Sequence, residues 1–130
     1  MPSFGTLKAD TLTHSTAGSL DTNFVVEGSA KAWVNFNGTG TIATRDSFNT
    51  SSLTDNGTGD YDNSFTTSFS NANYTHSGMS GDGGTSMRVV NQNFSAEAPT
   101  SGGSRYQIAY VNGTLDDPVF VGVTEHGDLA

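Results

Sequence analysis

Hydrophobic and polar residues alternate along several short stretches of this chain, and the alternation predicts β-strands. The clearest stretch covers residues 30–37, AKAWVNFN. Every second residue lies on the same face of a strand, so one face carries Ala30, Ala32, Val34 and Phe36. The opposite face is polar except for Trp33, the only tryptophan of the chain. The pattern therefore indicates a half-buried strand.

A hairpin is predicted where two strand-like segments, residues 48–53 and 61–65, flank the sequence DNGTG at residues 55–59. The two central residues of the tightest hairpin turns have positive φ, a conformation that Asn-Gly supplies. We expect Asn56 and Gly57 to form this turn.

Further strands are predicted over residues 74–79, 86–94, 105–111 and 119–123, and a brief one over residues 41–44 that ends at Arg45 and Asp46. Tyr106, Ile108 and Tyr110 share one face of the third of these. The Gly-rich residues 80–85 and the segment 96–104 are expected to be loops. Short strands separated by turn residues favour an all-β fold, either a small antiparallel β-sandwich or a partly open barrel, over residues 29–130.

Residues 1–28 read differently, and we call them the arm. Residues 6–13 alternate, but neither face is apolar enough to anchor a core, residues 14–23 are loop-like, and residues 24–27 suggest a short strand. The sequence predicts an extended arm that needs a partner, either its own domain or a neighbouring subunit.

Composition supports the all-β prediction, because 61 of the 130 residues are Ser, Thr, Asn or Gly, which disfavour helix. The same composition leaves few apolar residues for a core, so we expect sister copies to complete the interior. The net charge of −8 argues against a nucleic-acid partner. With no cysteine, neither disulfides nor thiolate metal sites are available. No apolar run approaches the roughly 20 residues of a membrane span, and the first residues do not resemble a secretion signal, so we expect a protein made in a cytoplasm and not inserted in a membrane.

Catalytic and metal-binding patterns are weak. Asp55, Asp60 and Asp62 cluster at the predicted hairpin, but their spacing does not fit a calcium loop of the EF-hand type, and turn chemistry is the favoured interpretation. The three histidines, His14, His76 and His126, form no metal motif. Serine nucleophile signatures are lacking too, so we expect neither an enzyme nor a cofactor, while an ion shared by subunits on a threefold axis stays open.

Two sets of residues are candidates for contacts. The aromatic set is expected to pack between sheets or subunits, or else to stack on sugar rings, and it comprises Trp33, Phe36, Tyr61, Tyr74, Tyr106 and Tyr110. The loop set is expected to face a partner, and it comprises Gly81, Asp82, Gly83, Gly84, Pro99, Gly102 and Gly103.

One long segment resembles a known family. Residues 32–74 contain AWVNFNGTG, then SFN, then SSLTDNGTGDY, and end on ANY, and a later Asp117-Pro118 opens the last strand. This order closely resembles a domain of tail-fibre-like and other virion structural proteins of tailed bacteriophages. The likeness covers residues 30–123, and the opening GTLKADTL is similar to a short strand that often precedes such domains.

The resemblance implies a homotrimeric protein of the virion, built as a fibre-type module on the particle surface that mediates assembly and host contact. At 130 residues the chain has no room for a fibre shaft, so a second interpretation is a capsid decoration (cement) protein that stabilises the head shell through the arm. The partners expected are sister copies, other tail or capsid proteins and a host surface glycan. A third interpretation, outside virion architecture, is a soluble glycan-binding module.

Overall fold

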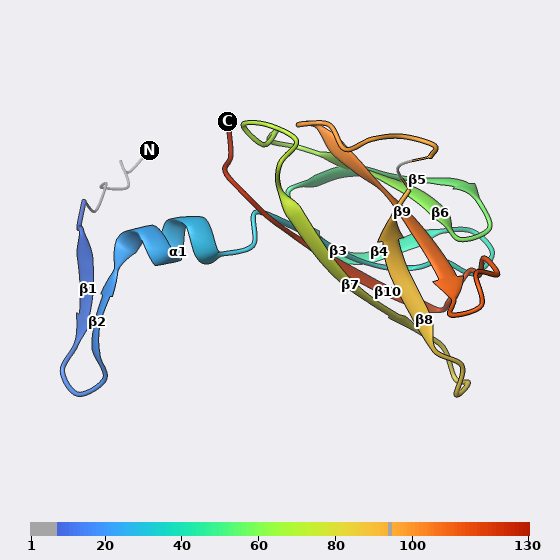
Figure 1. Cartoon of the computed structure of the whole chain (residues 1–130), viewed down its shortest axis with the longest axis horizontal. Helices are drawn as coiled ribbons and strands as arrows, with labels where there is room; N and C mark the ends of the chain where they lie inside the picture. The colour runs from blue at the N-terminus through green and yellow to red at the C-terminus, as the bar shows by residue number, and fades with distance from the viewer. Residues whose placement is uncertain (1–7, 94) are drawn as a thin grey trace.

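The computed structural model describes residues 8–93 and 95–130. Two four-stranded antiparallel sheets face each other, and the arm projects from them (Figure 1). The all-β prediction is confirmed, and the arrangement is consistent with a small β-sandwich. The predictions for residues 1–7, which include the first part of the alternating segment 6–13, and for Phe94 lie outside the described residues.

The first sheet has the order β4-β3-β10-β7. Its strands are β3 (Ala32–Asn37), β4 (Ala43–Phe48), β7 (Thr75–Gly81) and β10 (Phe120–His126). Ala32, Val34 and Phe36 are buried, as their alternation predicts, and Trp33 lies on the opposite face. The prediction that Arg45 and Asp46 interrupt the strand is wrong, because both belong to β4, whose register with β3 shifts between Asn35 and Phe36.

The second sheet has the order β5-β6-β9-β8. Its strands are β5 (Thr50–Gly57), β6 (Asp60–Phe65), β8 (Arg88–Gln92) and β9 (Gly103–Tyr110). The predicted hairpin is confirmed as β5 and β6. The prediction that Asn56 and Gly57 form its turn is wrong, because both belong to β5 and the turn residues are Thr58 and Gly59. The positive φ values belong to Gly57 and Gly59 and not to Asn56. A side chain at Gly59 would collide with the carbonyl of Ile108, so this turn requires glycine.

Apolar side chains from both sheets meet in one core. The core residues are Val34, Phe36, Tyr61, Tyr106, Ile108, Val121 and Val123. A second cluster of Ala32, Phe65 and Phe69 continues the interior, and the ring of Tyr74 packs edge-on against Phe65 with 5.6 Å between centroids. A single chain thus encloses its own hydrophobic core, which a small-polar composition did not lead us to expect.

The arm contains the hairpin β1 (Thr11–His14) and β2 (Gly18–Asp21), followed by helix α1 (Thr22–Gly28). Two predictions are wrong here: residues 14–23 are not all loop, because they include β2, and residues 24–27 are helix and not strand. No residue of α1 is buried. The Lys31 ammonium donates hydrogen bonds to the carbonyls of Val26 and Ser29, which fixes the end of α1 where the sandwich begins.

Candidate functional site

An apolar hollow lies on the outer face of the first sheet, and we call it the sheet groove. It has a volume of about 400 Å³. Ten uncharged residues from β3, β7 and β10 line it: Trp33, Val34, Asn35, Ser77, Gly78, Met79, Phe120, Gly122, Val123 and Thr124. A second hollow of about 350 Å³ shares Met79 and Phe120 and extends toward Gly83.

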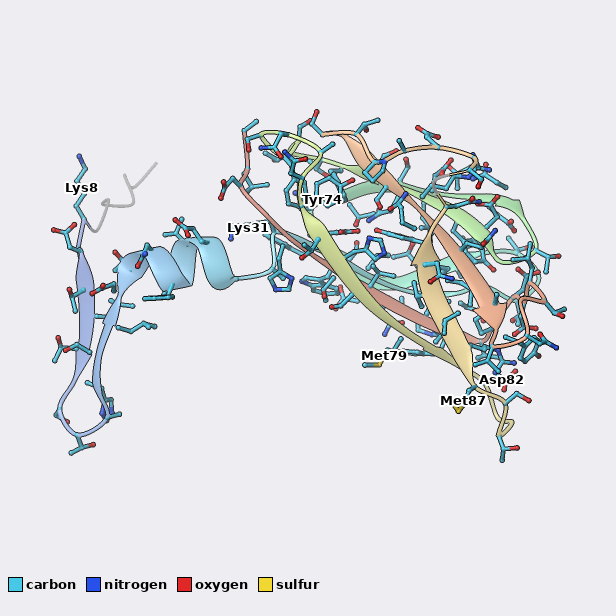
Figure 2. The ribbon with its side chains drawn as sticks, viewed as in Figure 1. Lys8, Lys31, Tyr74, Met79, Asp82 and Met87 are labelled. Atoms are coloured by element: carbon cyan, nitrogen blue, oxygen red, sulfur yellow. The ribbon has the colours of Figure 1, made fainter. Side chains whose placement is uncertain are left out.

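Strand register explains why these residues lie together. Trp33 pairs with Thr124, and Gly122 pairs with both Asn35 and Met79, so their side chains share the face that points away from the core. Gly122 leaves the floor open, because a Cβ there would meet Phe120 at 3.4 Å and Met79 at 3.8 Å. Met79 is 67% exposed and points away from the sandwich in Figure 2.

Arg45 fixes one wall of the sheet groove. Its guanidinium lies 6.0 Å from the centroid of the Phe120 ring and donates hydrogen bonds to the carbonyls of Val119 at 2.6 Å and Phe36 at 2.8 Å. These contacts hold Phe120 in place, so the groove is preformed. Its polar side chains are Asn35, Ser77 and Thr124, together with the indole N–H of Trp33.

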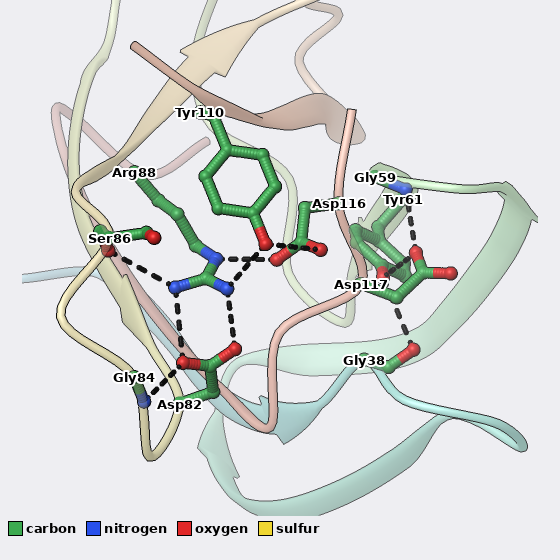
Figure 3. Close-up of polar contacts among 10 residues, drawn as sticks. All are labelled: Gly38, Gly59, Tyr61, Asp82, Gly84, Ser86, Arg88, Tyr110, Asp116 and Asp117. Carbon is green, nitrogen blue, oxygen red and sulfur yellow. Dashed lines mark hydrogen bonds and ion pairs between the residues drawn. The ribbon is translucent and has the colours of Figure 1, made fainter. Parts of the chain in front are cut away.

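The predicted contact loop at residues 81–84 is tied down by Arg88 (Figure 3). The Arg88 side chain is 2% exposed and forms ion pairs with Asp82 and Asp116. It also lies over the Tyr110 ring, with its central carbon 4.6 Å from the centroid. The Gly84 N–H and the Arg88 charge lower the pKa of the Asp82 carboxyl. The ionised Asp82 side chain therefore holds the loop in place through its ion pair with Arg88.

A second tie joins the hairpin to the loop before β10. The Tyr61 hydroxyl and the Gly59 N–H both donate to Asp117 Oδ1 at 2.6 Å (Figure 3). Burial and the neighbouring Asp117 carboxylate raise the pKa of Tyr61, which keeps the hydroxyl protonated as a donor. Asp117 therefore acts as a structural acceptor that links two turns.

The three aspartates considered as a calcium cluster each have a partner within the chain. Arg105 donates to both oxygens of Asp60 at 2.8 and 2.9 Å and lies 3.5 Å from Asp62. This hydrogen bonding lowers the pKa of Asp60. Asp55 accepts the Gly57 N–H at the turn. Among residues 8–93 and 95–130, no group of three or more His, Asp or Glu side chains is placed to hold a metal ion.

A buried polar cluster, which sequence reasoning missed, lies between the two sheets. Glu125 is fully buried, and the Tyr106 hydroxyl donates to its Oε1 at 2.6 Å while Asn63 donates to the Tyr106 oxygen at 3.2 Å. Burial raises the pKa of Glu125 to about 8, and the hydrogen bond from Tyr106 opposes the rise. The His76 ring packs edge-on against Tyr106, and burial lowers the pKa of His76.

The aromatic contact residues do not form one surface. Phe36, Tyr61 and Tyr106 are fully buried within a single chain, so they are available neither to a sugar nor to a second subunit. Tyr74 and Tyr110 are half-buried, and the Tyr74 hydroxyl donates to the Gly103 carbonyl at 2.7 Å. Of the six candidates, Trp33 alone lies in the sheet groove.

The two predicted contact loops do not lie together either. Gly81 is the last residue of β7 and not a loop residue as predicted, and Asp82 to Gly84 follow it. Gly103 instead accepts a hydrogen bond from Tyr74, which precedes the start of β7. Pro99 and Gly102 belong to the segment that leads into Gly103. Gly103 itself is the first residue of β9. The loops therefore occupy opposite ends of the sandwich and cannot meet one partner as a single surface.

No family model, no curated protein and no solved structure matches this chain. In the part of the chain that the structure describes, no helix has the length and apolar character needed to cross a bilayer.

Proposed function

We propose that this chain is a structural protein of a tailed bacteriophage virion, a homotrimeric fibre-type module on the particle surface that mediates assembly and host contact. The resemblance of residues 30–123 to such domains supplies the class of protein. The observation that carries an assembly role is the pair of exposed apolar surfaces, the arm and the sheet groove, on an otherwise acidic and polar chain. Contiguous apolar surface on a soluble domain marks a place where another molecule binds.

The proposal assigns no catalytic reaction, cofactor or nucleic-acid partner to the chain. Its most strongly paired ionic groups, Arg88 with Asp82 and Asp116, and Arg105 with Asp60, brace loops and strands. Such a frame suits a rigid module whose binding surfaces must hold their shape.

Two experiments test the proposal at different levels. Size-exclusion chromatography with light scattering on the full chain is expected to give a particle three times the monomer mass of 13.5 kDa. Electron cryo-microscopy of a whole virion is expected to place density for the chain at the tail. A monomer at all attainable concentrations would contradict the trimer, and density confined to the head shell would replace the fibre-type assignment with the alternative below.

The alternative is a capsid decoration protein, and the unburied arm is the observation that favours it. In that case the apolar residues of the arm pack on capsid subunits. The isolated protein then stays monomeric, and it binds empty capsids in a manner that deletion of residues 1–28 abolishes.

A glycan-binding role is the third candidate, because Trp33 lies beside Asn35 and Thr124 in the sheet groove. An aromatic face with neighbouring polar groups is suited to a sugar ring. Glycan-array binding that is lost in Trp33→Ala would favour this role, and it would fit host contact by the same groove.

A further inference from the structure

The arm presents an apolar strip that nothing in the described chain covers. Leu12 and Leu20 pair directly across the hairpin and are 44% and 46% exposed. A hollow between the hairpin and α1 continues the strip from Leu12 to Val25 and Val26. Phe24, on the same short helix, is also exposed.

The arm cannot hold this conformation by its local bonds alone. A helix of seven residues is far shorter than the roughly 12–15 residues at which isolated helices become marginally stable in water. The Asp21 N-cap makes no side-chain capping bond, and an isolated two-stranded hairpin is marginal at best. A folded arm therefore requires a surface on which Leu12, Leu20, Val25 and Val26 lie.

The sheet groove has the complementary character. None of its ten lining residues is charged, and they include Trp33, Met79 and Phe120. Depletion of charge and enrichment in aromatic residues and Met are the compositional marks of the centre of a protein interface. The groove thus provides an uncharged apolar surface against which the apolar strip of the arm can be buried. Elsewhere the net charge of −8 discourages self-association of the chain.

The attachment of the arm favours another copy over the chain's own groove. The bonds from Lys31 to Val26 and Ser29 hold the end of α1 at the start of β3, and from there the arm points away from the sandwich (Figure 1). Residues 8–28 make 21 residues, within the range of about 20–30 residues that each side of a standard interface contributes. The arm is thus long enough to act as one side of a stable contact.

We propose that the arm of each chain lies in the sheet groove of a second copy. This inference rests on the proposed function, since it names the contact that joins the subunits of the module. The contact is head-to-tail, because the arm and the groove are different surfaces, and such a contact closes into a ring when the rotation between copies allows it. Three copies complete the ring in the proposed homotrimer.

Site-directed cross-linking tests the proposal, because these 130 residues contain no cysteine. Val26→Cys in one chain and Met79→Cys in a second, differently tagged chain would be mixed and treated with a short bismaleimide. The control is Val111→Cys, which is 67% exposed like Met79 but lies in the turn after β9 of the other sheet. The Val26–Met79 product is expected to form at least ten times faster than the Val26–Val111 product.

Charge substitutions give a second readout on the same positions. Val26→Glu and Met79→Glu are each expected to raise the dissociation constant of the assembly at least tenfold, whereas Val111→Glu leaves it unchanged. All three side chains are at least 65% exposed, so circular dichroism should show an intact fold.

The outcomes separate this inference from the proposed function. A trimer whose Val26–Met79 cross-link forms no faster than the control overturns the arm-to-groove contact and leaves the trimeric module standing. A cross-link confined to one chain in the double variant Val26→Cys/Met79→Cys at high dilution overturns it in favour of docking on the chain's own groove. A chain that remains monomeric at every concentration overturns both.

Discussion

The sandwich and the arm solve the problem of hydrophobic burial in opposite ways. In the sandwich, alternating strands from two sheets enclose Val34, Phe36, Tyr61 and Tyr106 almost completely. In the described arm, residues 8–28, no residue is buried, and Phe24 is 62% exposed. Burial of apolar area is the dominant favourable contribution to folding, so the sandwich is expected to fold as a single chain and the arm is not.

This difference changes the part that assembly plays in the structure of the protein. The low apolar content of the chain suggested that sister copies complete its interior, yet the interior is closed within one chain. What is left open is the outside: the strip on the arm and the sheet groove. Assembly in our proposal therefore joins finished sandwiches and does not build their core.

The largest expected effect is a difference in the free energy of unfolding between substitutions at Phe36, in the core, and at Phe24, in the arm. Phe36→Ala removes a fully buried ring from the core and is expected to lower the free energy of unfolding by about 3–5 kcal/mol. Phe24→Ala, in the arm, is expected to change it by less than about 0.5 kcal/mol in the monomer. Urea denaturation followed by Trp33 fluorescence measures both. Equal losses would contradict the division into a self-sufficient sandwich and a dependent arm.

A smaller effect comes from the buried carboxyl in the sandwich. Because the folded pKa of Glu125 is raised to about 8, the folded state holds a proton that the unfolded state has already released above its ordinary pKa near 4.5. Stability therefore falls as pH rises through this window, by at most about 1.4 kcal/mol per pH unit. Between pH 6.5 and 8 we expect a loss of about 2 kcal/mol.

The variant Glu125→Gln provides the matched control for this pH dependence, because it cannot ionise. Its stability should be flat between pH 6.5 and 8 where the unmodified chain declines. His76 acts in the opposite sense but at lower pH, since its lowered folded pKa makes stability rise with pH up to about 6.5. Parallel urea midpoints for the two proteins would rule out Glu125 as the origin.

The next smaller effect on stability is expected at the hydrogen bond between Tyr61, in the β5–β6 hairpin, and Asp117, in the loop before β10. Tyr61→Phe removes the hydroxyl that donates to Asp117 at 2.6 Å and should cost about 1–2 kcal/mol of unfolding free energy. In an Asp117→Asn background the same change should cost less, because the charged acceptor is gone. Additive losses in the double variant would mean that the two side chains are not energetically coupled.

The smallest effect is expected when the arm is removed. Deletion of residues 1–28 takes away no buried side chain of the described chain, so the urea midpoint of the sandwich should move by less than the equivalent of about 0.5 kcal/mol. The same deletion should abolish assembly. A sandwich that fails to fold without residues 1–28 would show that the arm stabilises it directly.

Local sequence predicts the sandwich well where apolar and polar residues alternate along a strand, because every second side chain then points into the core. Ala32, Val34 and Phe36 alternate with polar residues and are buried. The DNGTG segment marks the hairpin, but its turn is formed by Thr58 and Gly59 and not by Asn56 and Gly57. The same alternation also places two polar residues on the buried face. Glu125 follows Val121 and Val123 at two-residue spacing, and Asn63 lies between Tyr61 and Phe65 at the same spacing. Both polar side chains are therefore buried.

The sheet groove and the internal structure of the arm could not be predicted from sequence, for two physical reasons. Trp33, Met79 and Phe120 lie on three strands far apart in the chain, and only the register of β3, β7 and β10 brings them together. In the arm, Phe24, Val25 and Val26 favour strand by intrinsic preference, yet they form helix. A segment this short is decided by its surroundings more than by its own residues.

Amide hydrogen exchange across a protein dilution series tests the central claim most directly, because it reads the sandwich and the arm separately in one sample. The claim predicts that amides of β3, β6, β9 and β10 are protected at every concentration, and that amides of residues 11–28 become protected only where light scattering shows assembly. An arm that is equally protected in the dilute monomer, or unprotected in the assembled state, would contradict it.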